Sequence, residues 1–65
     1  MQIDTQKIML ILAEKGLTKK AFAERSGVSR QNISTILCRG TCEPVTAGKL
    51  ATGLGVSVSE FMVDT

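Results

Sequence analysis

The chain has 65 residues, of which 43% are hydrophobic and 22% charged, and its formal net charge is +2. This length permits one domain, and the composition is typical of a compact folded domain rather than a disordered tail. Because no apolar run approaches the roughly 20 residues of a membrane span and the N-terminus does not resemble a signal peptide, we expect a single domain over residues 1–65, located in the cytoplasm and without membrane contact.

A first helix is predicted over about residues 4–15, with Gly16 as its end. Its inward face, chosen by helical spacing, contains Ile8, Ile11 and Leu12. Met9 and Leu10 lie outside this face, so the helix is apolar over a wide arc. Part of that arc is therefore available to a partner outside the monomer.

Two short helices joined by a tight turn are predicted in the middle of the chain. Thr18 caps a helix over about residues 19–26, because its hydroxyl accepts a hydrogen bond from a free N–H of the first turn. Gly27 is expected to end that helix in the left-handed conformation, which glycine adopts without a Cβ clash. Ser29 caps the second helix, over about residues 30–38. The apolar face of this second helix contains Ile33, Ile36 and Leu37.

A fourth helix is predicted after a turn-rich loop at residues 39–44. Pro44 suits its first position, where a missing N–H costs nothing, and the helix is expected to reach residue 54. Its residues available for the core are Val45, Leu50, Ala51 and Leu54. Gly48 and Gly53 each cost the helix about 1 kcal/mol relative to alanine. Close approach of a neighbouring helix would explain both glycines.

The chain is predicted to end in a fifth, short helix that Ser57 caps. Its apolar stripe contains Val58, Phe61 and Met62. No strand pattern or repeat is present. The predicted fold class is therefore all-α, a compact bundle of about five short helices.

Two segments of this chain carry a family resemblance. Residues 23–36 read AERSGVSRQNISTI, in which a small residue lies four positions before a glycine that a branched residue follows, and residues 54–61 read LGVSVSEF. With these segments the chain resembles the phage-repressor (lambda-repressor-like, Cro-type) helix-turn-helix family over residues 8–62. The resemblance implies a helix-turn-helix motif at about residues 18–38 whose second helix reads the major groove of double-stranded DNA.

The chain departs from the family pattern in two places. Many members carry a buried Arg paired with a Glu, and the matching positions here are Leu12 and Leu37. Replacing a buried ion pair by packed apolar residues is often neutral or stabilising when both partners change. The usual glycine after the second helix of the motif comes one residue late, at Gly40, behind Arg39.

Positive charge is concentrated in the motif, as a phosphate backbone requires. Residues 15–41 have a net charge of +5, whereas residues 1–14 have −1 and residues 42–65 have −2. From the N-terminal part of a helix in the major groove, Arg pairs with guanine, Gln with adenine and the Thr methyl group with that of thymine. The expected base contacts are Arg30, Gln31, Asn32 and Thr35. The expected phosphate contacts are Lys19, Ser29, Ser34, Arg39 and Thr41. Ordinary exposed polar surface remains the alternative for each of these side chains.

The chain lacks most of the residues that metal binding and catalysis require. The chain has two cysteines and no histidine, so the four Cys or His ligands of a structural zinc site are not available. We expect free thiols, with Cys38 half-buried at the end of a helix and Cys42 in a loop. Serine and cysteine lack a base partner at a recognisable spacing, so we expect no enzyme, no cofactor and no metal.

These observations predict a sequence-specific transcriptional regulator of the repressor type that binds DNA as a homodimer. A two-fold dimer doubles the few base contacts that so small a monomer makes. Met62 and Val63 are the expected dimer surface, with Phe61 facing the core and Met9 or Leu10 as the competing surface. With no second domain, we expect no small-molecule effector. An antitoxin of a toxin–antitoxin pair and a protein-interaction module that has lost DNA binding are the alternatives.

Overall fold

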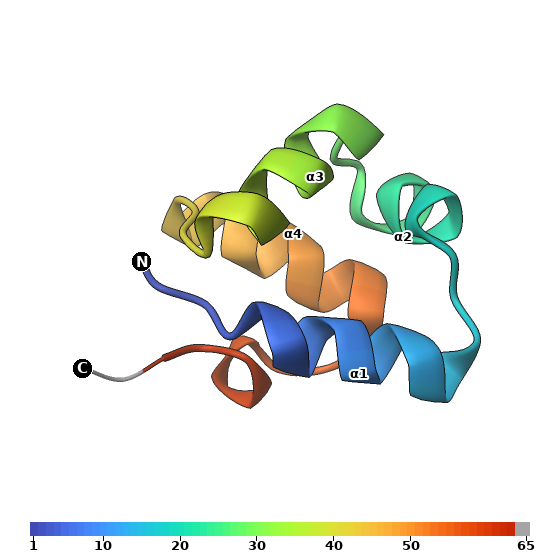
Figure 1. The fold of residues 1–65 in the computed structure, drawn as a ribbon, viewed down its shortest axis with the longest axis horizontal. Helices are drawn as coiled ribbons and strands as arrows, with labels where there is room; N and C mark the ends of the chain where they lie inside the picture. The colour runs from blue at the N-terminus through green and yellow to red at the C-terminus, as the bar shows by residue number, and fades with distance from the viewer. Residues whose placement is uncertain (64–65) are drawn as a thin grey trace.

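The computed structural model describes residues 1–63 and contains four α-helices followed by one turn of 3-10 helix (Figure 1). These elements are α1 (Thr5–Lys15), α2 (Lys19–Ser26), α3 (Arg30–Arg39), α4 (Pro44–Leu54) and η1 (Val58–Glu60). The described residues form no strand, and the predicted all-α class is confirmed. None of these helices is long and apolar enough to cross a lipid bilayer.

The fifth helix is the part of the fold prediction that is wrong. In its place η1 makes a single turn, which Ser57 caps by accepting a hydrogen bond from the Ser59 N–H at 3.4 Å. The chain leaves the helical conformation there because the next residues pair with the start of the chain. Met62 faces Ile3 in an antiparallel bridge, and the Val63 N–H donates to the Gln2 carbonyl at 3.1 Å.

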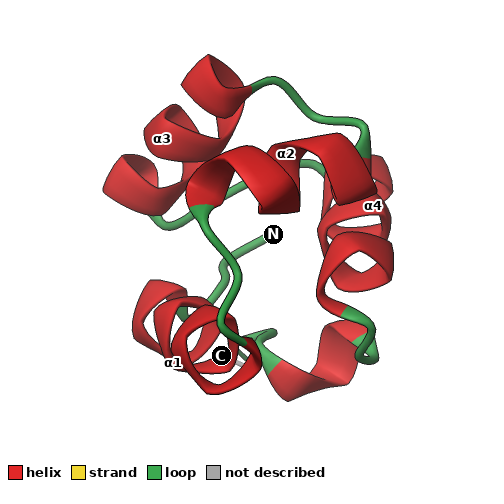
Figure 2. Cartoon of the chain, turned by 90° about the vertical axis from the view of Figure 1, so that its right-hand side faces the viewer, coloured by secondary structure: helices red, strands yellow, loops and turns green. Residues whose placement is uncertain are grey.

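The α-helices surround one apolar core. α2 packs against both α3 and α4, and Figure 2 shows α1 and α3 on one side of the molecule and α4 on the other. Every α-helix and the C-terminal segment contribute a side chain that is almost fully buried. These side chains are Ile8, Phe22, Ile33, Leu50, Leu54 and Phe61.

Serine, threonine and aspartate side chains fix where the first three helices begin. Asp4 accepts a hydrogen bond from the Lys7 N–H at 3.0 Å, so it caps α1 rather than starting it. Thr18 caps α2 through the Ala21 N–H at 3.1 Å, as predicted. α3 extends one residue beyond the predicted end, to Arg39.

The two glycines inside α4 have different surroundings. A Cβ added at Gly53 would lie 2.7 Å from the Cβ of Ser26 and 3.0 Å from its Cα and backbone nitrogen. A Cβ added at Gly48 would have no neighbour within 4 Å. The expected close approach of a helix is therefore confirmed at Gly53, where α4 meets α2, and is wrong at Gly48.

Val45, predicted as a core residue, is 71% exposed. The buried residues of α4 include Ala47, Leu50, Ala51 and Leu54. These recur at helical spacing, whereas Val45 precedes Ala47 by two positions and so falls on the opposite face. Val45 was predicted to be buried because it is apolar, although its position in the helix is not on the face that the buried residues share.

Residues 1–4, here called the N-terminal segment, lie between two distant parts of the chain. Gln2 forms an antiparallel bridge with Thr41 in the loop between α3 and α4, and Ile3 forms one with Met62. Ile3 is only 4% exposed and belongs to the core. No sequence pattern indicated this arrangement.

Candidate functional site

The turn between α2 and α3 has the geometry that the sequence indicates. Gly27 has φ +75°, and its N–H donates to the Ala23 carbonyl at 2.9 Å, which closes α2. Val28 is buried in the core, and Ser29 caps α3 by accepting from the Asn32 N–H at 3.2 Å. A left-handed residue, a buried residue and a capping residue in succession set the direction in which α3 leaves α2.

Most of the surface of α3 faces away from the core. Ile33 is its one buried residue, and Ile36 and Leu37 are half-buried against the core cluster. The exposed residues of α3 are Arg30, Gln31, Asn32, Ser34, Thr35, Cys38 and Arg39. All four side chains predicted to contact bases are therefore exposed to solvent.

Helical spacing orders these exposed residues. Gln31, Thr35 and Cys38 recur at intervals of four and three, which puts them along the middle of the exposed face. Arg30 and Asn32 flank that line. Cys38 was predicted to be half-buried and is exposed, because five residues from Ile33 correspond to a rotation of about 140° on a helix of 3.6 residues per turn. The sequence reasoning therefore missed it as a neighbour of the candidate base contacts.

Two hydroxyl groups of the candidate site are engaged with their own helix. The Thr35 hydroxyl donates its proton to the Gln31 carbonyl at 3.0 Å. Thr35 can therefore offer a ligand only the hydroxyl oxygen as an acceptor and its methyl group for packing. Ser29 uses its oxygen as an acceptor for the Asn32 N–H, which leaves its hydroxyl proton free to donate. Ser29 is therefore suited to an acceptor such as a phosphate oxygen, and Thr35 is suited to an apolar contact.

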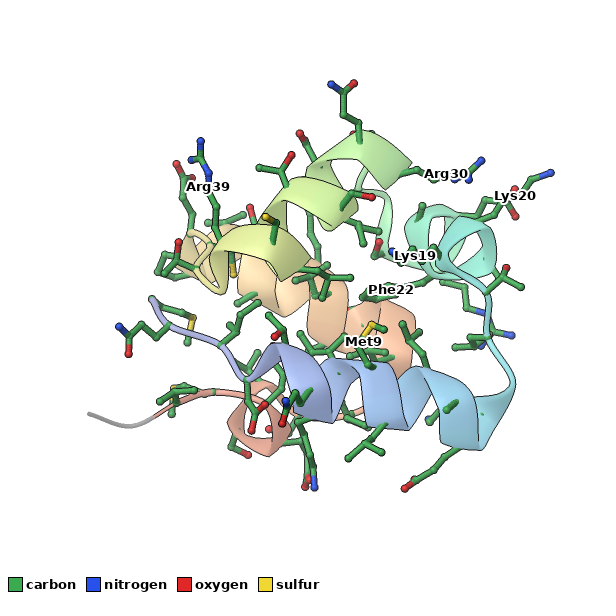
Figure 3. All side chains as sticks on the ribbon, in the orientation of Figure 1. Met9, Lys19, Lys20, Phe22, Arg30 and Arg39 are labelled. Carbon is green, nitrogen blue, oxygen red and sulfur yellow. The ribbon has the colours of Figure 1, made fainter. Side chains whose placement is uncertain are left out.

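Basic side chains lie toward both ends of α3. Figure 3 shows Arg39 at the C-terminal end and Arg30 at the N-terminal end, with Lys20 of α2 extending toward the same edge of the molecule as Arg30. Lys19 at the start of α2 is also exposed. Lys20 was counted in the charge of the motif but not among the phosphate contacts, and the structure makes it a further candidate.

A surface hollow of about 390 Å³ adjoins the C-terminal end of α3. Thr35, Arg39 and Thr41 line it, so one predicted base contact and two predicted phosphate contacts come together there. Cys42 also lines the hollow, and burial raises the pKa of its thiol above the ordinary value, an effect that the positive charge of the Met1 amino group opposes. The Cys42 thiol is therefore an uncharged part of the lining at neutral pH.

Comparison with known protein families supplies an independent observation. A family model described as the Cro/C1-type HTH DNA-binding domain matches residues 7–65. The match begins within α1 and includes α2, the turn, α3, α4 and η1. No curated protein and no solved structure matches the chain.

Proposed function

The chain belongs to the Cro/C1-type HTH DNA-binding domain family, a family of DNA-binding regulators, and we propose that it is a sequence-specific transcriptional regulator that inserts α3 into the major groove. The observation that carries the proposal is the exposed surface of α3, whose polar side chains lie between basic groups at its two ends. A helix in the major groove meets base edges along its exposed face and a phosphate backbone on either side.

Within this proposal the side chains divide by their chemistry. Gln31 reads adenine through its amide. The Thr35 methyl group packs on a thymine methyl group, because the Thr35 hydroxyl is bonded to its own helix and the methyl group is left free for this contact. Arg30 and Asn32, at the sides of the same face, reach the neighbouring base pairs. The side chains assigned to the phosphates are Lys19, Ser29, Ser34, Arg39 and Thr41. A domain seated in this way over a promoter blocks the polymerase, which is the repressor action that we propose.

Selection of bound sequences from a random pool of double-stranded DNA tests the proposal. The expected result is a short, roughly symmetric motif whose half-sites lie about one helical turn apart, ~34–36 Å. Symmetry tests the dimer, and enrichment tests specific binding. A pool that remains random after repeated rounds, with no binding at low salt, would contradict DNA recognition and favour a protein-interaction role for this fold.

The first prediction separates base reading from phosphate contact at the two ends of α3. Arg30→Ala is expected to cost ~1–3 kcal/mol on the selected site and to relax preference at one base pair. Arg39→Ala is expected to weaken binding to all sequences alike and to reduce the slope of log affinity against log salt by about 0.9. Titrations of specific and scrambled duplexes at several salt concentrations measure both effects.

The control in this comparison is Lys19→Ala, which should behave as Arg39→Ala does, since both are assigned to the backbone. Arg30 lies at the N-terminal end of α3 and toward the edge that Lys20 also occupies (Figure 3), so it is compared directly with the two side chains assigned to phosphates. An equal loss on specific and scrambled DNA would move Arg30 to the phosphate contacts.

The second prediction concerns the dimer. Met62 and Val63 are 43% and 38% exposed, while Phe61 between them and η1 is fully buried. We propose that Met62 and Val63 pack on a two-fold mate. Met62→Lys is then expected to weaken self-association and operator affinity together without lowering the melting temperature of the monomer, as measured by sedimentation and circular dichroism.

The matched control for Met62→Lys is Leu10→Lys. Met9 and Leu10 are 50% and 59% exposed and line an open hollow of about 420 Å³ on α1, which makes them the competing surface. Dissociation by Leu10→Lys and not by Met62→Lys would transfer the interface to α1. A parent protein that sediments as a monomer both free and on DNA would remove the dimer altogether.

A further inference from the structure

The loop between α3 and α4 is held in place by the N-terminal segment. The Ile3 N–H donates to the Gly40 carbonyl at 2.9 Å, and the Cys42 N–H donates to the Met1 carbonyl at 3.0 Å. The Met1 amino group donates in turn to the Cys42 carbonyl at 2.8 Å. Within residues 1–63, the hydrogen bonds that join residues 40–42 to distant parts of the chain are all made with this segment.

The other side of the N-terminal segment is fixed to the body of the protein. The Asp4 N–H donates to the carbonyl of Phe61 at 2.7 Å, and the Val63 N–H donates to that of Gln2 at 3.1 Å. Phe61 is fully buried and Ile3 is 4% exposed, so both anchor in the core. The segment therefore connects the position of the loop to the position of the core.

The pairing also determines where the backbone of Thr41 points. The backbone hydrogen bonds of these paired segments join Ile3 to Gly40 and Cys42 to Met1. Gln2 and Thr41 therefore face each other without a hydrogen bond between them. In an antiparallel pair of this kind the N–H and C=O of the facing residues point away from the partner strand. The Thr41 N–H is thus directed away from the N-terminal segment, on the exposed loop that follows Arg39.

We propose that the N-terminal segment is a positioning element for DNA binding: through the bond between Ile3 and Gly40 it holds Arg39 and the Thr41 N–H where they contact one phosphate backbone. The inference rests on the proposed function, since it names what places one group of its phosphate contacts. Gly40 ends α3 in a left-handed conformation, and in the loop after the helix the Gly40 carbonyl is bonded to Ile3 and the Cys42 N–H and carbonyl to Met1. Ile3 acts here through the loop and does not itself touch DNA.

Three substitutions isolate the bond between Ile3 and Gly40. Ile3→Pro removes the N–H that donates to Gly40 together with the side-chain packing, whereas Ile3→Ala removes packing and keeps the N–H. Gln2→Pro places a proline in the same segment at an exposed residue whose N–H donates none of these bonds. Each variant is compared with the parent chain at a temperature where circular dichroism shows it folded.

The expected result is that Ile3→Pro alone reduces the slope of log affinity against log salt, by about 0.9 for each phosphate that the protein no longer neutralises. Arg39→Ala should cost a smaller fold-loss of affinity in the Ile3→Pro background than in the parent, because Arg39 is already displaced from its phosphate there. Arg30→Ala, at the other end of α3, should cost the same fold-loss in both backgrounds. A segment with a purely structural role would instead give Ile3→Pro and Ile3→Ala the same slope and would leave the cost of Arg39→Ala unchanged.

Amide hydrogen exchange in the parent protein tests the segment without any variant. The Cys42 amide should exchange slowly because it is bonded to Met1, and the Thr41 amide should exchange fast in the free protein and become protected on DNA. A Cys42 amide as fast as that of an unbonded residue, or a Thr41 amide that DNA leaves unprotected, overturns the proposal even if Ile3→Pro fails to fold. A parent chain that binds no DNA sequence refutes the proposed function itself, whereas normal binding with equal behaviour of Ile3→Pro and Ile3→Ala refutes only the role of the segment.

Discussion

Leu12→Arg is expected to remove most of the stability of the protein, so that a large fraction of the chain is unfolded at 25 °C. Leu12 is 5% exposed and belongs to the core cluster, so the new guanidinium would be buried without a partner. An uncompensated buried charge costs ~3–5 kcal/mol, which is about the stability that a single core of this size supplies. Urea denaturation followed by circular dichroism measures the loss. The control is Leu12→Met, which nearly conserves volume and should cost less than about 1.5 kcal/mol.

The partner substitution, Leu37→Glu, should be milder. The sequence alone suggested that Leu12→Arg and Leu37→Glu cost the same free energy of unfolding. Leu37 is only half-buried, however, so the carboxylate of the new glutamate can turn toward water. The double variant is expected to recover part of the loss of Leu12→Arg, because each charge then has a partner. Strict additivity of the two costs would show that residues 12 and 37 do not interact and would count against their alignment with the family ion pair.

The helices of this fold were predictable because their signals are local. Thr18, Ser29 and Gly27 each act on backbone groups within four residues of themselves, so the sequence contains both the signal and its target. The phase of a helix is also local, and the errors at Val45 and Cys38 came from reading composition where spacing was decisive. The rotation from Ile33 to Cys38 was available in the sequence.

The N-terminal segment was not predictable in this way. Gln2 and Ile3 pair with Thr41 and Met62, which are remote in the chain, and a segment of four residues has no periodicity of its own. The same distant pairing reduced the fifth helix to the single turn η1. Where hydrogen bonds join residues far apart in sequence, local propensity does not decide which partner wins.

The candidate site also has features that the nearby sequence determines and features that depend on distant parts of the chain. The residue types that suit bases and phosphates were readable from the sequence, and the exposed face of α3 accommodates them. The position of Lys20 of α2 relative to α3, and the bonds that hold the loop of Thr41, depend on packing between elements. The chemistry of the proposed interface is therefore a property of the motif, and its placement is a property of the whole fold.

Gly48 and Gly53 provide the sharpest test of packing against propensity. Both are glycines inside α4, so replacement by alanine gives each the same gain in helix propensity. Gly48→Ala is expected to stabilise the protein by ~0.5–1 kcal/mol, because the added methyl group meets nothing within 4 Å. Gly53→Ala is expected to destabilise it by ~1–3 kcal/mol through overpacking.

The reason for the opposite sign lies at the crossing of α2 and α4. The methyl group of Gly53→Ala would lie 2.7 Å from the Ser26 Cβ and 3.0 Å from backbone atoms of α2, so the helices must separate. Ser26 is also buried, with its hydroxyl bonded to the Ala23 carbonyl and the Val28 N–H, each at 3.3 Å. Separation therefore disturbs the residues that lead into the turn before α3.

Thermal melts measure this pair, since 1 kcal/mol shifts the midpoint by roughly 4–8 °C in a domain of this size. Gly48→Ala should melt above the parent and Gly53→Ala below it, and only Gly53→Ala should also lose DNA affinity, because α2 and the turn orient α3. Ser26→Gly added to Gly53→Ala should restore part of the stability by removing the nearer atom of the clash, although it gives up the two hydroxyl bonds. Equal shifts of the same sign for both alanines would mean that α4 does not approach α2 at Gly53 as closely as 2.7 Å, and the explanation of that glycine by packing would fall.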